Sequence, residues 1–378
     1  MPPGLGLYLH LPFCPARCPY CDFNAKTYDH GEARRLLAGL AVHLGRIASL
    51  AGGRRLATVY FGGGTPAMLP AAVLASLLAQ ISEAPGLEPT AEISLEANPG
   101  ALSPLKLTAL RAAGFNRLSL GAQSFDPSLL KALGRRHSPE STRRAVAAAR
   151  RAGFANLNLD LIYGLPGQSP ALAAADLEAA LALEPEHLSL YELTLSPGTP
   201  FGRHFRPGRP PLPGDEEIVQ MEERAERLLE AVGLRRYEVS NYARPGLECR
   251  HNQATWQGGD YLSLGPGAHG HLAGVRWAWV ADPSEYCRLV EAGEEPLAMR
   301  EELSPEQRAL ELILLGLRTV RGVELAPLAV LLGANPRRVY ARALAELHRQ
   351  GWGRIAQGRI IPTRAGLNMA DAAAALFA

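Results

Sequence analysis

Three cysteines near the start of the chain form the pattern with the clearest chemical meaning. They are Cys14, Cys18 and Cys21, in the run Cys-Pro-Ala-Arg-Cys-Pro-Tyr-Cys. Spacings of four and three residues let three thiolates converge on one inorganic centre, and sulfur ligands favour iron–sulfur clusters or zinc. A four-iron cluster has four corners, so three cysteines leave one iron open to a small molecule.

Two other interpretations of this loop stay open. Buried structural thiols are disfavoured because Pro15, Arg17 and Pro19 are hard to pack in an apolar core. Structural zinc needs a fourth ligand, which His10 or Asp22 could supply. The spacing C-x3-C-x2-C followed by Asp-Phe resembles the signature of radical S-adenosylmethionine (SAM) proteins. In those proteins the amine and carboxylate of methionine chelate the open iron.

Length and composition indicate a globular protein that is large enough for a sizeable core and nearly neutral in charge. A chain of 378 residues with 47% hydrophobic content can form one large domain, or one large and one small domain. The net charge of +2 indicates no bulk electrostatic binding to nucleic acid or anionic lipid. We expect no signal peptide and no bilayer span. Five cysteines, an odd number, argue against a disulfide framework and favour a reducing cytoplasm.

The first half of the chain alternates strands with helices. Strands are expected at 5–13, 56–61, 91–97, 115–123, 155–162 and 187–195, and the first helix at 32–49. Such repetition implies right-handed crossovers and a parallel sheet. Six units favour a partial (β/α)6 barrel, with an open doubly wound sheet as the alternative.

These strands alternate apolar and polar residues. Leu157, Leu159 and Leu161, for example, alternate with Asn158 and Asp160. Successive side chains point to opposite faces, so one face would pack on helices and the other would be polar. Buried polar groups need partners, and a lumen that holds a large polar ligand would supply them.

The sequence of the second half predicts a segment that covers the barrel and a small second domain. We expect a long ordered loop over the barrel mouth, or a linker, at 196–214. A helix at 215–232, a strand at 237–242 and an irregular segment at 248–280 should follow. Helices at 306–317 and 336–350 and a two-stranded ribbon at 352–361 resemble a winged helix. We therefore expect a barrel over 1–282 and a small domain over 283–378, whose arginines form a solvated face rather than a nucleic-acid site.

Several motifs stand in a fixed order along the chain: Tyr8-x-His10-x-Pro12-Phe13-Cys14, Gly62-Gly63-Gly64-Thr65-Pro66, Glu96-Ala97-Asn98-Pro99, Gly121-Ala122-Gln123-Ser124, the segment 158–168 and His251-Asn252. Together they resemble the oxygen-independent coproporphyrinogen III oxidase family of radical SAM proteins, and within it the heme chaperone branch. The resemblance covers nearly the whole chain.

The resemblance implies a [4Fe–4S] cluster on the three cysteines and a SAM site in the lumen. Glu96 and Asp160 suit the ribose hydroxyls, Arg135 suits the carboxylate, and backbone groups of 62–65 would reach the methionine amine. The implied SAM-binding residues are Tyr8, Tyr20, Gly63, Gly64, Thr65, Glu96, Gln123, Arg135 and Asp160. No catalytic residue is assigned.

Two departures from the oxidase pattern favour the chaperone branch. The decarboxylating oxidase has a fourth cysteine two residues after the third, where this chain has Phe23. The oxidase also has a long extension before its Tyr-x-His segment, whereas Tyr8 stands almost at the start here. Both differences disfavour coproporphyrinogen decarboxylation.

The chaperone branch carries an HNxxYW segment credited with holding heme, near the barrel mouth in our expectation. Here it reads His251-Asn252-Gln-Ala-Thr255-Trp256, with threonine in place of tyrosine. His251 would be an axial ligand of heme iron, Trp256 could pack on the porphyrin, and Cys249 is a second candidate ligand.

The expected function is that of a cytoplasmic heme chaperone on a radical SAM scaffold, with an apo-hemoprotein as acceptor. An electron donor is implied if SAM is cleaved, and transient membrane contact stays open. The alternatives are coproporphyrinogen III dehydrogenase or a related radical SAM methyl or alkyl transferase.

Overall fold

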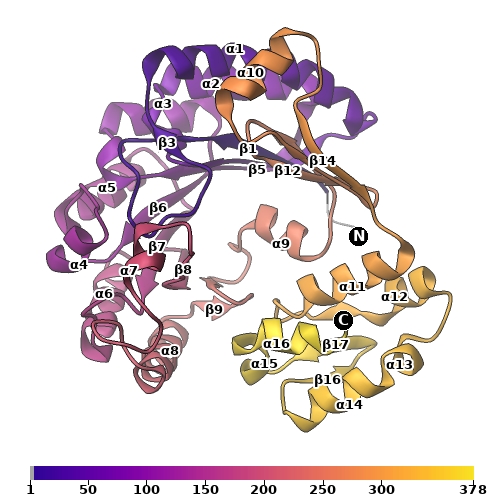
Figure 1. Ribbon diagram of the computed structural model, residues 1–378. Helices are drawn as coiled ribbons and strands as arrows, with labels where there is room; N and C mark the ends of the chain where they lie inside the picture. The colour runs from indigo at the N-terminus through magenta and orange to yellow at the C-terminus, as the bar shows by residue number, and fades with distance from the viewer. Residues whose placement is uncertain (1–3) are drawn as a thin grey trace.

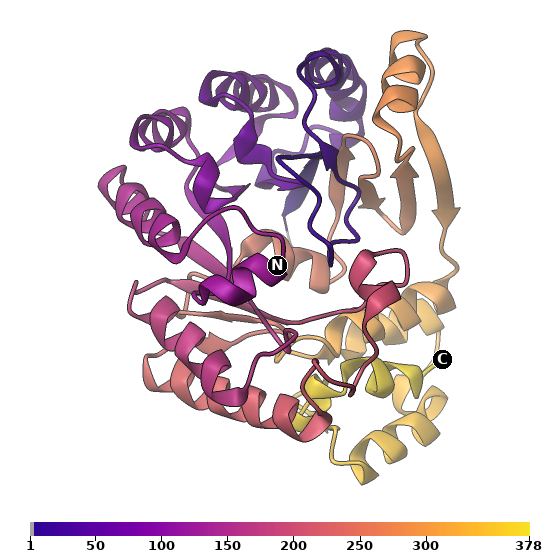
Figure 2. The same ribbon diagram turned by 60° about the vertical axis from the view of Figure 1, so that its left-hand side comes forward.

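The computed structural model describes residues 4–378 and is organised around one long, curved sheet. Its twelve strands follow the order β14-β13-β12-β11-β1-β4-β5-β6-β7-β8-β10-β9. Figures 1 and 2 show this sheet curving around a central space, with helices on its outer side. The sheet is an open, partial barrel, which confirms the predicted fold class.

The six predicted strands are present and parallel, and they form the middle of the sheet. They are β1 (Leu5–Leu11), β4 (Leu56–Gly63), β5 (Leu87–Ala97), β6 (Arg117–Gln123), β7 (Leu157–Tyr163) and β8 (His187–Glu192). Because all six run the same way, their carboxyl ends meet at one rim of the barrel.

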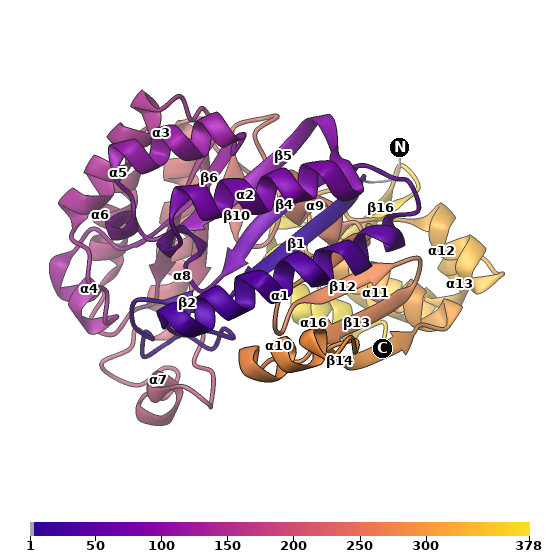
Figure 3. The same cartoon turned by 90° about the horizontal axis from the view of Figure 1, so that it is seen from above.

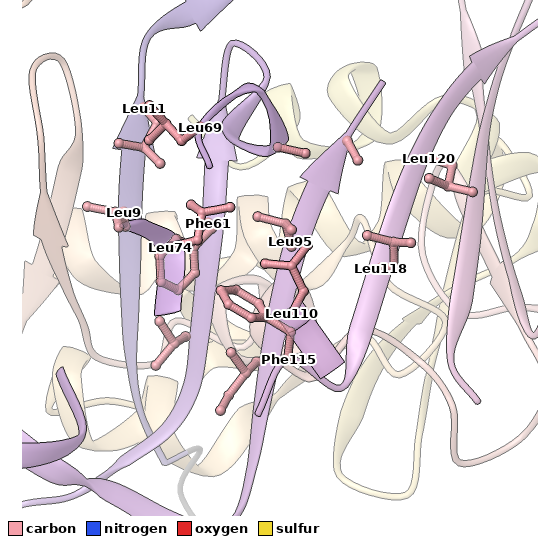
Figure 4. Close-up of a cluster of buried hydrophobic side chains, with 14 of the residues drawn as sticks. Leu9, Leu11, Phe61, Leu69, Leu74, Leu95, Leu110, Phe115, Leu118 and Leu120 are labelled. Carbon is pink, nitrogen blue, oxygen red and sulfur yellow. The ribbon is translucent and has the colours of Figure 1, made fainter. Parts of the chain in front are cut away.

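Helices cover the apolar outer face of these strands. They are α1 (His30–Ala48), α2 (Ala71–Ile81), α3 (Pro104–Ala113), α5 (Pro139–Arg151), α6 (Pro170–Leu181) and α8 (Asp215–Ala231). Figure 4 shows Leu9, Phe61, Leu95 and Leu118 from four strands packed in one layer with Leu110 of α3. The alternation in the sequence therefore places leucines outward and polar side chains in the lumen.

Shorter strands and helices lie at the rim where the six parallel strands end. The cysteine loop pairs β2 (Phe13–Cys14) with β3 (Lys26–Thr27). Also at this end are α4 (Pro127–Ala132) and α7 (Pro200–His204). The helix α7 lies within the predicted loop over the mouth, and its Phe201 N–H donates to the Pro19 carbonyl at 3.0 Å.

The sheet continues past both ends of the parallel core, which the sequence did not predict. The segment expected to be irregular contains α9 (Arg250–Trp256), β11 (Tyr261–Leu264), β12 (His269–Leu272) and β13 (Val275–Trp279). The strand expected at 237–242 is instead two short strands, β9 (Arg235–Arg236) and β10 (Asn241–Ala243). Pairing with distant strands, rather than local periodicity, stabilises these short segments.

The boundary expected after residue 282 does not match the packing. The helix α10 (Pro283–Glu291) packs on α1, and β14 (Leu297–Glu302) pairs with β13 in the main sheet. Tyr286 and Val290 lie in the main core, whereas Ala309 begins a separate core. We therefore propose that the small unit begins after Glu302.

The small unit combines helices with a three-stranded sheet. Its helices are α11 (Pro305–Gly316), α12 (Leu325–Leu332), α13 (Pro336–Val339), α14 (Ala341–Arg349), α15 (Arg364–Asn368) and α16 (Ala370–Ala375). Its strands are β15 (Val323–Glu324), β16 (Gly353–Ala356) and β17 (Arg359–Pro362). The predicted ribbon is β16 and β17, and β15 adds a third strand.

This unit bridges the open side of the barrel (Figure 1). On one side Arg276 of β13 forms an ion pair with Glu311 of α11 at 3.1 Å. On the other, Arg236 of β9 donates to Asn368 of α15 at 2.6 Å. The small unit therefore contacts both flanks of the sheet. No helix within residues 4–378 has the length and apolar character needed to cross a bilayer.

Candidate functional site

One cavity of about 460 Å³ occupies the lumen below the cysteine loop. Its wall brings together most of the predicted SAM-binding residues, which are Tyr20, Gly63, Gly64, Thr65, Glu96, Gln123, Arg135 and Asp160. All three cysteines of the loop line it as well. The cavity therefore begins at the rim formed by the strand ends, as expected for a barrel of this kind.

The cysteine loop directs Cys14, Cys18 and Cys21 to this cavity. Within it, the Cys21 N–H donates to the Cys18 carbonyl at 3.2 Å, which turns the chain back on itself. Burial raises the pKa of the Cys14 and Cys21 thiols. Thiols must lose their protons to become ligands, so metal uptake here would release protons.

The surroundings of the loop fit a cluster better than a single zinc ion. Among residues 4–378, no three His, Cys, Asp or Glu side chains converge closely enough for one metal ion. His10 Nε2 is already within 2.8 Å of the Asn24 carbonyl, and Asp22 accepts from Ser196 at 2.5 Å. Both proposed fourth zinc ligands therefore already have partners in the protein, whereas a cluster with one open iron needs only the three thiolates as protein ligands.

The glycine motif approaches the cysteine loop closely enough to exclude side chains. A Cβ at Gly64 would lie 2.7 Å from the Phe13 carbonyl oxygen, and Gly63 has a φ of 117°. The Gly64 N–H donates to Leu11 O at 2.9 Å and the Thr65 N–H to Phe13 O at 2.8 Å. These donors hold the loop, so only carbonyl oxygens of the motif would serve the methionine amine, which is itself a donor.

Glu96 lies at the centre of the polar wall. Its carboxylate accepts from the Tyr60 hydroxyl at 2.8 Å and from the Gly63 N–H at 3.2 Å. Burial raises the pKa of Glu96 to about 7, and Asp160 acts in the same direction, although the Tyr60 hydrogen bond opposes both. Near neutral pH this carboxyl is therefore partly protonated, and ligand hydroxyls that donate to it favour its ionised form.

Asp160, Gln123 and Arg135 surround the remainder of the cavity. Asn158 donates to Asp160 at 2.7 Å, and burial raises the pKa of Asp160. Gln123 has a φ of 66°, at an irregularity in the pairing of β6 with β7. A bulge of this kind redirects a side chain. The Arg135 guanidinium donates to Gly121 O at 2.7 Å and lies 3.8 Å from Cys18 Sγ, beside the position of a cluster.

Tyr8 faces the lumen, with its ring 6.2 Å from that of Tyr60, but lies beside the cavity rather than in its wall. Among the described residues, the cavity wall does not include Tyr8, whose hydroxyl lies 3.0 Å from His10 Nδ1. His10 in turn contacts the Asn24 carbonyl in the cysteine loop. The pair therefore positions the loop from beneath.

The helix α9, which carries His251, lies at the opposite end of the lumen from the cysteines. His251 Nδ1 is 2.9 Å from the Thr58 hydroxyl, and its ring is near Gly6, so it contacts the amino-terminal parts of β4 and β1. Figure 3 shows α9 near the start of β1 and the cysteine loop at its far end. The structure therefore separates this segment from the barrel mouth, where we expected heme to be accepted.

Buried Glu92 holds the first turn of α9 in place. Its carboxylate accepts from the N–H groups of Arg250 at 3.0 Å and His251 at 3.2 Å. A carboxylate at a helix N-terminus satisfies donors that have no partner within the helix. Burial lowers the pKa of His251 to about 4, so its imidazole is neutral at physiological pH. Neutral imidazole is the form that binds metals.

The other residues of the predicted heme segment separate in space. Asn252 lines the cavity, so the lumen reaches from the cysteines to α9. Trp256 instead faces the small unit, with the Arg318 guanidinium 5.9 Å from its ring. Cys249 is fully buried, and burial raises the pKa of its thiol to about 12. A protonated, enclosed thiol is a poor ligand.

Several cavity residues were missed as individual site residues. They are Tyr60, Arg117, Ser119, Asn158, Ser189 and Asn241. Arg117, Ser119 and Asn158 occupy polar positions of strands whose alternation had been recognised, so for these three the signal was present as a pattern. Which of these positions reach the cavity depends on the register between strands.

Family models match two parts of the chain. Residues 8–178 match the radical SAM superfamily, and residues 303–368 match the HemN C-terminal domain. Heme chaperone HemW of Mycobacterium tuberculosis is 38% identical over 97% of this chain and 93% of its own length. The chain belongs to the HemW family of radical SAM proteins. The start of the HemN C-terminal match agrees with a boundary after Glu302.

Two other HemW relatives and one solved structure agree with this family assignment. Heme chaperone HemW of Escherichia coli is 42% identical over 71% of each chain, and that of Bacillus subtilis is 35% identical over 91% of each. The structure of coproporphyrinogen III oxidase (HemN) from Escherichia coli superposes with a TM-score of 0.88 at 25% identity. The match covers 100% of this chain and 90% of the HemN chain, so this chain has the HemN fold.

Proposed function

We propose that this protein is a heme chaperone that binds heme and transfers it to an apo-hemoprotein. The observation that carries the proposal is the extent of the lumen cavity, which has three cysteines at one end and Asn252 of α9 at the other. One enclosed space thus joins a cluster site to the segment that carries His251. Similarity to proteins named heme chaperones supports the same function.

Within this proposal Cys14, Cys18 and Cys21 hold a [4Fe–4S] cluster and SAM binds at its open iron. When bound, the cluster supplies one-electron chemistry toward SAM, for which an electron donor would be needed. Arg135 balances the charge of the methionine carboxylate, and the Glu96 and Asp160 carboxylates accept from ribose hydroxyls. Gln123 is directed into the same space by its bulge.

His251 is the proposed heme ligand, at the floor of the lumen rather than at the mouth. Its imidazole is neutral, but its side chain is buried beneath the cavity. Ligation therefore requires α9 to shift relative to Thr58 and Glu92. The five free cysteines agree with a reducing cytoplasm as the proposed location.

The deciding experiment follows heme and SAM together. Reconstituted protein is titrated with heme, mixed with an apo-hemoprotein, and sampled for 5′-deoxyadenosine. A chaperone transfers heme without stoichiometric deoxyadenosine, whereas failure to bind or release heme contradicts the proposal.

The second candidate is a coproporphyrinogen III dehydrogenase, favoured by the structural match to HemN. A related methyl or alkyl transferase is a more distant alternative. Anaerobic incubation with coproporphyrinogen, SAM and a reductant tests the dehydrogenase directly. Formation of protoporphyrinogen would replace the chaperone proposal. Phe23, where the oxidase has cysteine, leads us to expect none.

A further inference from the structure

A buried arginine stands unpaired in the wall of the lumen. Arg117 is 2% exposed, yet it lines the cavity. Within residues 4–378 its Nε has no hydrogen-bond partner, and no carboxylate oxygen comes within 4.0 Å of its nitrogens. Arginine stays charged in proteins and carries five donors. Burying such a charge without a partner costs free energy, so we expect a ligand to supply the partner of Arg117.

The strand explains how the arginine comes to face inward. Arg117, Ser119 and Gln123 share the lumen face of β6, while Leu118 and Leu120 pack outward in the core. Register pairs Arg117 with Ser94 on β5, one step below the pair of Ser119 with Glu96. Arg117 therefore lies deeper than the SAM-binding residues and closer to α9.

The neighbouring carboxylates already accept hydrogen bonds from other groups. Glu92 accepts from the first turn of α9, and Glu96 accepts from Tyr60 and Gly63. Asp160 accepts from Asn158 and Ser119. Burial shifts the pKa of Glu96 and of Asp160 upward, and the positive charge of Arg117 opposes that shift in both. None of them neutralises Arg117 by direct contact.

A second unpaired polar group lies on the same wall. Asn241 of β10 lines the cavity, and its Oδ1 is buried without a hydrogen-bond partner among the described residues. Asn241 pairs with Ser189 of β8, which pairs with Asp160 of β7, and Asn252 of α9 lines the same cavity. A guanidinium and amides that face one cavity can bind a carboxylate through charge-assisted hydrogen bonds and fix its orientation.

We infer that Arg117 forms a carboxylate-binding subsite in the deep part of the lumen, with the Asn241 and Asn252 amides facing the same cavity, separate from Arg135 at the cysteine loop. The inference rests on the proposed function, because the carboxylate that reaches this depth is a propionate of bound heme. The other source of the same chemistry is the amino-acid carboxylate of SAM. Arg117 would thus determine that the cargo is an acidic porphyrin.

The test compares heme with heme dimethyl ester, whose carboxylates are masked. Wild-type protein should bind heme about tenfold or more tightly than the ester, as expected for a charge-assisted contact. Arg117→Gln should reduce that preference to about threefold or less. Arg136→Gln is the matched control, because Arg136 also lines the cavity but at its cysteine end. It should keep the wild-type preference.

Further arms separate the possible outcomes. If Arg117→Gln keeps the wild-type preference, the subsite is overturned and Arg117 is a structural counter-charge. If Arg117→Gln weakens SAM binding more than heme binding, the carboxylate belongs to SAM and the propionate assignment is wrong. Should the glutamine variant not fold, Arg117→Lys, which retains the charge, should keep the preference for heme at lower affinity. A folded lysine variant that loses the preference still supports the need for arginine geometry. An unchanged heme affinity in the lysine variant contradicts the subsite.

Failure of heme binding in the wild type would contradict the proposed function but not the subsite. In that case the cluster-loaded protein is heated in sodium propionate and in sodium chloride of equal ionic strength. A carboxylate-binding floor predicts a higher melting temperature in propionate for the wild type and Arg136→Gln, but not for Arg117→Gln. Equal melting temperatures in both salts for the wild type would overturn the subsite.

Discussion

The Tyr60 ring stacks on the imidazole of His251, with centroids 5.3 Å apart and planes inclined by 28°. Its hydroxyl meanwhile donates to Glu96 at 2.8 Å. One side chain on β4 thus contacts both the proposed SAM site and the proposed heme ligand. A shift of either neighbour changes the packing or hydrogen bonding of Tyr60, so the two sites are physically connected through it.

Tyr60→Phe should move the pH dependence of SAM binding upward. The Tyr60 hydroxyl lowers the pKa of Glu96 against the effect of burial, so its loss should raise that pKa above its value of about 7. Protonated Glu96 accepts ribose hydroxyls less well, and SAM affinity should fall near neutral pH and recover at higher pH. Calorimetric titration across pH measures this. Tyr340→Phe, in the small unit, should behave like the wild type.

Glu96→Gln should stabilise the cofactor-free protein at alkaline pH. A carboxyl with a pKa raised from 4.5 to about 7 opposes folding once it ionises. The penalty is absent below the unfolded pKa and complete above the folded one, where it reaches about 3 kcal/mol. Urea unfolding should show the variant gaining stability at about pH 8 and little at about pH 5. A gain independent of pH would contradict this account.

Cys14→Ala should remove most of the iron and sulfide from anaerobically purified protein. Two cysteines hold a four-iron cluster poorly, and the broad absorption near ~400 nm should disappear. Cys287→Ala is the control because Cys287 is buried between α10 and α1, in the main core. It should retain full iron. Stoichiometric zinc without sulfide in the wild type would refute the three-cysteine cluster.

Gly64→Ala should impair the cysteine loop without touching a ligand. The new Cβ would meet the Phe13 backbone, which cannot move without displacing the loop that begins there. We expect lower cluster occupancy and a loss of about 2 kcal/mol or more in stability. Gly45→Ala, where a Cβ on α1 meets nothing within 4 Å, should instead be neutral or stabilising. Equal iron content in both variants would argue against this tight contact.

His251→Ala should weaken the Soret band and the heme affinity of the reconstituted protein. A neutral imidazole is a good axial ligand, and no other residue of α9 offers one. The control is His204→Ala, an exposed histidine of α7 near the mouth. If His204→Ala has the larger effect, heme binds at the mouth and the placement at the lumen floor is wrong.

Local patterns were sufficient for the scaffold and for the place of the cysteine loop. Cys14, Cys18 and Cys21 are close in sequence, so their shared position on the cavity wall needed no knowledge of distant contacts. Alternation along each strand predicted a polar lumen, because side-chain direction follows from the period of two. The six parallel strands were predicted because strands and helices alternate along the chain.

Only the tertiary structure decided how segments far apart in the chain meet. The helix α9 was not predicted, and its position at the lumen floor depends on Glu92 and Thr58, more than 150 residues earlier. Tyr8 supports the loop rather than the cavity, since its hydroxyl is held by His10. Arg117 became a candidate only when register placed it in the cavity without a partner. Such placements arise from packing and pairing across the whole fold, which no local pattern encodes.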